Sequence, residues 1–121
     1  MQAIVTHAPG GPEQLQLADL PLPMPAPGEV LIRTIAAGVN GPDLAQRRGD
    51  YPPPPGASPL IGLEVAGEIV HPAGPWQIGD RVVALTNGGG YAEYVAVPAG
   101  QVLPIPSGWD PIDAAALPEY W

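Results

Sequence analysis

The chain has 121 residues, of which 16 are Gly and 19 are Pro. Disorder is still excluded, because Val, Ile and Leu make up about 24% of the chain and only 13% of the residues are charged. The net charge of −8, with four Arg and no Lys, excludes nucleic acid and anionic membrane surfaces as partners. The absence of Cys excludes disulfides, thiolate zinc sites and a cysteine nucleophile.

The length suits one domain, residues 1–121. The first residues have neither the basic region nor the apolar region of a signal peptide. Residues 51–63 are uncharged, but their five prolines are incompatible with a membrane span. We therefore expect a cytoplasmic protein.

The first half of the chain predicts three strands and one short helix. Residues 3–7 read as a strand, and residues 14–20 alternate polar and apolar side chains as a half-buried strand does. Proline at every second position makes residues 21–27 an extended segment. The strongest strand covers residues 30–37. A helix is predicted over residues 42–48, with Pro at its first position and Gly directly after its end.

The second half predicts more strands, joined by turns. Residues 51–59 are too rich in proline for regular structure. Further strands are predicted at residues 64–70, 81–85, 91–97 and 101–105. Within the first of these, Gly67 marks a bulge or a close backbone approach. Asp110 and Pro111 begin a short helix that continues through Leu117.

This many short strands at close spacing predicts a barrel or a sandwich, with ligand-binding groups on its loops. The loops at residues 38–59 and 86–90 are the candidates. The three glycines at 88–90 precede a predicted strand and not a helix, so they indicate a tight turn with positive φ and not a phosphate-binding loop. His7 and His71 are the only imidazoles and lie far apart in the sequence, so no metal site is predicted.

The polar residues Asn40, Asp43 and Tyr51 flank the predicted helix 42–48 and allow two interpretations. An amide, a carboxylate and a phenol are the sparse polar groups that orient a ligand in an apolar cleft. Turn chemistry also explains two of them, because Asn40 before Gly41 suits a positive φ and Asp43 suits the first turn of the helix. On spacing alone this is the favoured interpretation. Gly62 and Gly67 bracket Glu64, which indicates a buried, hydrogen-bonded structural carboxylate at that position.

Seven segments together resemble one family, the zinc-independent quinone oxidoreductases of the medium-chain dehydrogenase/reductase superfamily. The resemblance is to the zeta-crystallin type, and within it to the tumour-suppressor-inducible quinone oxidoreductase subgroup. It covers essentially the whole chain. The segments are residues 36–40, 43–51, 53–58, 62–67, 79–82, 88–95 and 114–119.

The resemblance implies a mainly β fold, a GroES-like partly open β-barrel with short helices. This is the catalytic domain of the family. The nucleotide-binding Rossmann domain of the family lies outside these residues, which end where the family enters a connecting helix. Zinc-dependent relatives carry Cys where this chain has Asn40 and His where it has Leu63, so the resemblance implies no catalytic metal.

The resemblance also implies an activity, hydride transfer from NADPH to a quinone. It assigns Tyr51, Asn40 and Asp43 to the catalytic cleft, and Asn40, Asp43 and Gln46 to contact with the cofactor. Tyr51 is expected to hydrogen-bond the quinone oxygen or to donate a proton to it. Without the cofactor domain, the 121 residues alone are expected to be inactive.

An alternative reading is a non-enzymatic GroES-like barrel that acts as a scaffold or interaction module. In either case the surface between the two domains of the family would be exposed. Exposed apolar surface favours self-association. The candidate contacts are Trp109, Tyr120 and Trp121.

Overall fold

The structure is a computed structural model that describes residues 1–120, and it is mainly β with a few short helices. Trp121 lies outside the described residues. The strands are β1 (Gln2–Thr6), β2 (Leu15–Asp19), β3 (Glu29–Ala37), β4 (Glu64–His71), β5 (Arg81–Leu85), β6 (Tyr94–Pro98) and β7 (Val102–Pro104). The helical segments are η1 (Pro12–Gln14), α1 (Gly41–Arg48), η2 (Ala99–Gln101), α2 (Pro111–Ala114) and α3 (Leu117–Tyr120).

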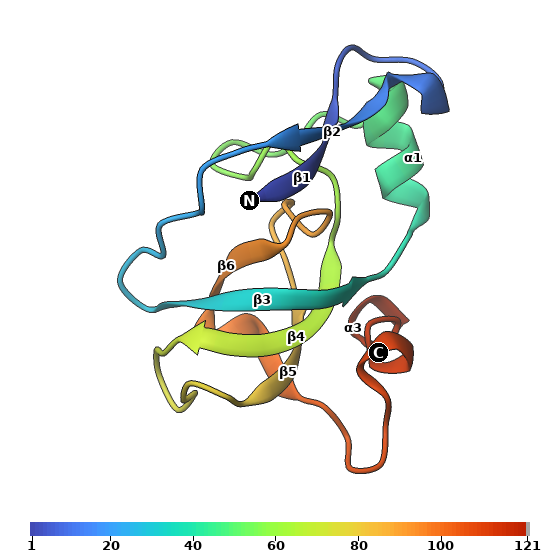
Figure 1. Cartoon of the computed structure of the whole chain (residues 1–121). Helices are drawn as coiled ribbons and strands as arrows, with labels where there is room; N and C mark the ends of the chain where they lie inside the picture. Colours follow the sequence, from blue (N-terminus) through green and yellow to red (C-terminus); the bar gives the residue numbers. More distant parts are fainter. Residues whose placement is uncertain (121) are drawn as a thin grey trace.

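The strands form two antiparallel sheets. The larger sheet has the order β6-β3-β4-β5-β7, and β1 pairs with β2 in a separate ribbon. Figure 1 shows this ribbon above β6, with α1 beside it and α3 near the far end of β3. All pairs between the described strands are antiparallel, so residues 1–120 contain no βαβ unit. No helix in this part of the chain is long and apolar enough to cross a membrane.

The ribbon is attached to the larger sheet by backbone hydrogen bonds. Ile4 N donates to Tyr91 O at 2.8 Å, and Glu93 N donates to Gln2 O at 3.0 Å. Ala3 also forms an isolated bridge with Ala92. The strand β6 begins at Tyr94 and not at Tyr91 as the alternation predicts, because the backbone of residues 91–93 pairs with β1. Only Glu93 O already bonds to β3, where it accepts from Thr34 N at 2.8 Å.

The core consists mainly of β-branched side chains on alternate strand positions. Each buried Val or Ile contributes roughly 1.5–3 kcal/mol of transfer free energy. A second, smaller cluster lies on the other face of β4 and β5, where α2 packs on Ala66 and Val83. The main cluster comprises Val30, Ile32, Val65, Ile69, Val82, Ala84, Val95, Val97 and Val102.

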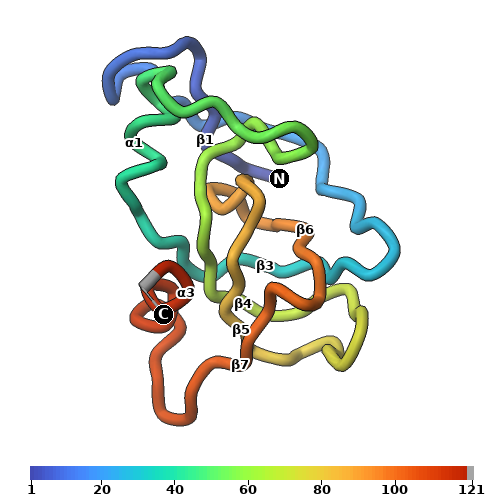
Figure 2. The backbone as a smooth tube through the Cα atoms, turned by 180° about the vertical axis from the view of Figure 1, so that it is seen from behind, coloured from blue at the N-terminus to red at the C-terminus, as the bar shows by residue number. Residues whose placement is uncertain are grey.

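The C-terminal helix predicted to run from Asp110 through Leu117 is interrupted. Asp110 begins α2 as expected, with its carboxylate accepting a hydrogen bond from Ile112 N at 2.8 Å. The helix ends at Ala114 and a second turn, α3, starts at Leu117. Pro118 has no N–H to donate to the Ala114 carbonyl, so the helix cannot continue through it. Figure 2 shows this end of the chain folded back beside β5 and β7.

Gly67 marks the predicted close approach between strands. A Cβ on this residue would overlap Arg33 O and would come within 2.6 Å of the Ile32 side chain. The pairing of β3 with β4 shifts register at the same point, between Thr34 and Ala36. The strand prediction and the bulge are both confirmed, and the glycine allows β3 and β4 to approach closely.

Substituting Gly67→Ala will therefore destabilise the protein by roughly 1–3 kcal/mol, because the added methyl group has no free space. Urea unfolding measures the loss. Gly100→Ala is the matched control, because a Cβ there meets nothing within 4 Å. Equal stability of the two variants would contradict the close packing of β3 against β4.

Candidate functional site

A cavity of about 400 Å³ opens between α1, the proline-rich loop (residues 51–59) and the glycine turn (residues 86–90). This volume lies within the range of small-molecule sites. Gln46 projects from α1, and its Nε2 donates to Pro59 O at 3.2 Å, which joins the proline-rich loop to the helix. The lining residues are Gln46, Tyr51, Pro53, Pro54, Pro55, Gly56, Ala57, Ser58, Leu63, Thr86, Asn87 and Gly88.

The wall formed by residues 86–89 depends on glycine. Gly88 and Gly89 have φ of 76° and 86°, so the prediction of a positive-φ turn is confirmed. A Cβ on Gly88 would lie 2.7 Å from Ser58 O, so the two loops touch through their backbones. Thr86 Oγ1 donates to Gly62 O at 2.7 Å and holds the start of the turn beside Leu63.

A buried polar cluster lies at the N-terminal end of α1. Glu64 is only 1% exposed, and its carboxylate accepts hydrogen bonds from Asn40 Nδ2 at 3.1 Å and from Glu119 N at 2.8 Å. Gly38 leaves room for it, because a Cβ on Gly38 would overlap the Glu64 side chain. The prediction of a buried structural carboxylate is confirmed.

Asp43 is the second buried carboxylate, with 3% of its surface exposed. Its Oδ2 accepts from Asn40 N at 3.1 Å and from the Tyr91 hydroxyl at 2.6 Å. Asn40 is the N-cap of α1 and Asp43 lies in its first turn, where the helix dipole favours a negative charge. The first-turn position expected of Asp43 is therefore confirmed, whereas the positive φ expected of Asn40 is wrong, because Asn40 caps the helix from an extended backbone with a φ of −130°. Oδ1 of Asp43 has no hydrogen-bond partner among the described residues.

The cluster raises the pKa of two groups, the Tyr91 phenol and the Glu119 carboxyl. Burial, together with the hydrogen bond and charge of Asp43, raises the pKa of the Tyr91 phenol far above its ordinary range. The phenol therefore keeps its proton and remains a donor to Asp43. Partial burial, and then the negative charges of Glu64 and Asp43, raise the pKa of Glu119. The cluster is thus held together by neutral donors, namely an amide, a phenol and backbone N–H groups.

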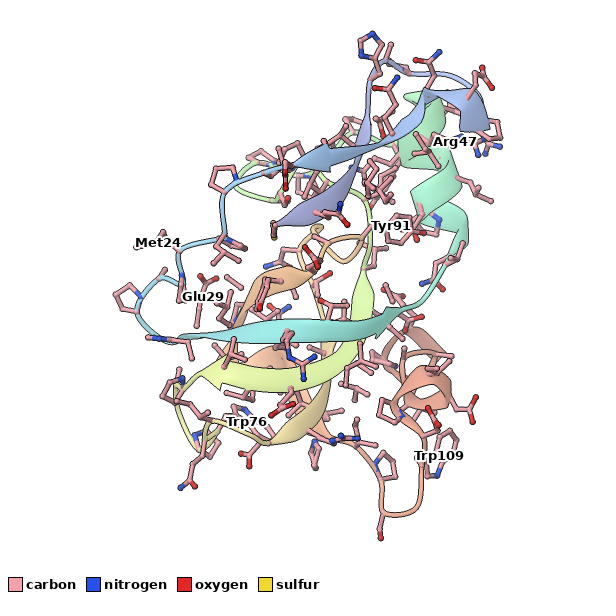
Figure 3. The ribbon with its side chains drawn as sticks, in the orientation of Figure 1. Met24, Glu29, Arg47, Trp76, Tyr91 and Trp109 are labelled. Carbon is pink, nitrogen blue, oxygen red and sulfur yellow. The ribbon has the colours of Figure 1, made fainter. Side chains whose placement is uncertain are left out.

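The candidate site residues fall into two groups in the structure. Gln46 and Tyr51 line the cavity together with Leu63, and Tyr51 is 48% exposed. Asn40 and Asp43 do not line it but lie in the buried cluster, at the other end of α1. Figure 3 shows Tyr91 close to α1, between the ribbon and β3.

Sequence reasoning missed Tyr91 and Glu119 as members of this cluster. They are separated from their partners by 48 and 55 residues, so no local pattern indicates the contacts. Among residues 1–120 there is no group of three or more His, Asp or Glu that could hold a metal ion. Both histidines are exposed.

Comparisons with known proteins agree on one domain type. A family model described as the alcohol dehydrogenase GroES-like domain matches residues 26–107. A mouse protein named synaptic vesicle membrane protein VAT-1 homolog-like is 38% identical over 98% of this chain, which spans 29% of that protein. A quinone oxidoreductase of Lama guanicoe is 37% identical over 97% of the chain, which spans 37% of it.

Solved structures show the same similarity. The quinone oxidoreductase from Thermus thermophilus, whose structures include a complex with NADPH, superposes with a TM-score of 0.79 at 43% identity. The match covers 98% of this chain and 37% of that structure. The chain thus spans about a third of the length of the relatives it matches.

Replacing Tyr91→Phe will destabilise the fold by roughly 1.5–3 kcal/mol, because buried Asp43 then loses its hydroxyl donor. Urea unfolding at pH 7 measures this loss. Tyr94→Phe is the control, since its hydroxyl makes no hydrogen bond with the described residues. If both variants were as stable as the parent, the bond between Tyr91 and Asp43 would have no energetic role.

Proposed function

The chain belongs to the alcohol dehydrogenase GroES-like domain family, and on that basis we propose that it is the substrate-side domain of a quinone oxidoreductase. The activity proposed for the whole enzyme is hydride transfer from NADPH to a quinone. The relatives named quinone oxidoreductase support an oxidoreductase role in general, and the choice of NADPH and quinone is the proposal.

The cavity between α1 and the proline-rich loop is the observation that carries this proposal. Its walls combine apolar Pro53–Pro55 and Leu63 with the polar groups of Gln46 and Tyr51. Such a lining suits a planar ring that carries carbonyl oxygens, since the ring packs on the apolar wall and the oxygens find donors. The nicotinamide end of the cofactor and the quinone both match that description.

When bound, NADPH supplies a hydride, and the quinone with this hydride and one proton becomes a hydroquinone. Tyr51 is proposed to donate a hydrogen bond or that proton to the quinone oxygen. Asn40 and Asp43 are proposed to shape the cofactor end of the cleft, with Gln46 at its side. The protein contributes orientation and a water-poor surface, which lower the entropic cost of the reaction.

The proposed enzyme is of the zinc-independent, zeta-crystallin type. Asn40 and Leu63 stand where zinc-dependent relatives have their Cys and His ligands. An amide that donates to Glu64 and an aliphatic side chain in the cavity wall both fit a cleft that works without a metal. The cytoplasm is the proposed location.

We expect the 121 residues alone to bind a quinone but to oxidise NADPH poorly, because they span only about a third of the quinone oxidoreductases that they match. Titration of 1,4-naphthoquinone into the ¹⁵N-labelled chain should shift the amide resonances of Gln46, Tyr51 and Gly88. Tyr51→Phe should weaken binding roughly 3–10-fold, the net effect of one hydrogen bond. Tyr94→Phe should not.

Two results would decide against this proposal. If naphthoquinone shifts no resonance of the cavity lining, the alternative of a non-enzymatic GroES-like scaffold gains support. If the chain alone oxidises NADPH with quinone as fast as a full-length relative, the expected need for a second domain is wrong.

The isolated chain is also proposed to self-associate through the apolar surface near its C-terminal end. Leu103, Trp109 and Ile112 are 50%, 46% and 67% exposed there. A groove of about 210 Å³ lined by Val83, Leu103, Pro104, Pro106, Leu117 and Pro118 lies on the same side. The other two contacts expected from the sequence fall outside what the structure describes, namely Trp121 and the side chain of Tyr120.

Sedimentation velocity at rising concentration should show reversible dimers, and Trp109→Ser should shift the chain toward monomer. Met24→Ser is the control, because Met24 is 89% exposed and lies on the opposite side of the molecule (Figure 3). A concentration-independent monomer mass for the parent chain would refute this proposal.

A further inference from the structure

The chain contains two asparagines, Asn40 and Asn87, and each is followed directly by a glycine. An asparagine before glycine loses its side-chain nitrogen readily. Glycine has no Cβ to shield its backbone nitrogen, and its flexible backbone lets that nitrogen approach the asparagine side chain. Both pairs contain the same reacting groups, so the fold decides which of them reacts.

The fold holds the first pair in place. Asn40 Nδ2 donates to Glu64 Oε1 at 3.1 Å, and Asn40 N donates to Asp43 Oδ2 at 3.1 Å. The Asn40 carbonyl oxygen accepts from Asp43 N at 3.0 Å, and Gly41 is the first residue of α1. Attack of Gly41 N on the Asn40 side chain would therefore disrupt the start of the helix and the hydrogen bond to a charged carboxylate.

The second pair is exposed and held by a single hydrogen bond. The Asn87 carbonyl oxygen accepts from Ser58 N at 2.9 Å, and the Asn87 side chain is exposed. Neither the Asn87 amide nor Gly88 N forms a hydrogen bond with another residue that the structure describes. Both reacting groups of this pair are therefore accessible to each other and to water.

We infer that Asn87 is a modification site, at which the protein deamidates spontaneously through attack by Gly88 N. A bond forms between Gly88 N and Cγ of Asn87, and the bond from Cγ to Nδ2 breaks. The amide nitrogen leaves as ammonia and takes the proton of the Gly88 N–H. Water then opens the resulting succinimide at either carbonyl, which gives aspartate or isoaspartate. The reaction changes no oxidation state and does not depend on the proposed function.

Deamidation at this position alters a wall that two cavities share. Asn87 and Gly88 line the cavity described above and also a second one of about 490 Å³. Both products place a carboxylate there, and isoaspartate also adds one methylene to the backbone. A Cβ on Gly88 would lie 2.7 Å from Ser58 O and 2.8 Å from Leu60 O, so there is little space on that side. Isoaspartate is therefore expected to loosen the contact of this turn with Ser58 and Leu60.

The first experiment incubates the full chain at neutral and at mildly alkaline pH and follows both asparagines by mass spectrometry. Trypsin cleaves after arginine, so residues 34–47 and 82–121 form separate peptides with one asparagine each. Asn87 should deamidate roughly 10–100-fold faster than Asn40, because Asn40 must first break a hydrogen bond to a charged group. Its rate should rise with pH, because the attacking nitrogen loses its proton. Equal rates, or a faster reaction at Asn40, would overturn the inference.

Two controls identify the cause and the place of the reaction. In urea Asn40 is released from Glu64, so the two asparagines should deamidate at similar rates. A preference for Asn87 that persists in urea would refute selection by the fold. In Asn87→Gln the corresponding ring has six members and forms more slowly, so the peptide 82–121 should remain unmodified. The same modification of that peptide in the variant would exclude Asn87 as the site.

Hydrogen exchange tests the effect on the shared wall. Ser58 N donates to Asn87 O and Gly89 N donates to Leu60 O, both at 2.9 Å. In the isoaspartate form both amides should exchange roughly 3–10-fold faster, the net effect of one lost hydrogen bond. Asn87→Asp is the matched control, since it adds the charge without the methylene and should keep both amides protected. Unchanged exchange in the isoaspartate form would contradict the expected loosening of the wall.

Discussion

The rest of this domain depends on one constraint, the burial of the Glu64 carboxylate, which removes its negative charge from water. A buried carboxylate is costly unless its oxygens accept hydrogen bonds, and here the donors come from 24 residues earlier and 55 residues later in the chain. The loop after β3 and the helix α3 must therefore both be docked for Glu64 to be satisfied. Gly38 and the close packing at Gly67 leave the space in which this happens.

The helix α1 connects this buried cluster to the cavity. Its first turn carries Asp43, which is held by Tyr91, and one turn later Gln46 lines the cavity and holds the proline-rich loop. At its C-terminal end Arg47 Nε donates to Gly10 O at 3.1 Å, so both ends of the helix are fixed. A wall fixed in this way is rigid, which is what the proposed orientation of a ligand in the cavity requires.

Much of the fold follows from local patterns. The β5 bounds agree with the prediction. The helix α1 ends before Gly49 as predicted and begins at Gly41, one residue before the predicted start at Pro42. The errors occur where long-range pairing competes with local preference: residues 91–93 pair with β1 and delay β6, and Pro118 divides the last helix. Asp43 lies in the first helical turn as expected, but Asn40 is extended and lacks the expected positive φ. The role of both residues toward a cofactor stays a proposal that came from the family resemblance.

The sequence by itself determined the β class, the single helix beside the proline-rich loop, the positive-φ turn at Gly88–Gly89 and the burial of Glu64. These depend on side-chain alternation and backbone freedom, which act within a few residues. Only the tertiary structure decided that Tyr91 reaches Asp43, that Glu119 N reaches Glu64 and that Asn40 lies between the two carboxylates. Such contacts depend on how distant strands pair, and that pairing is set by the packing of the whole core and not by any one segment.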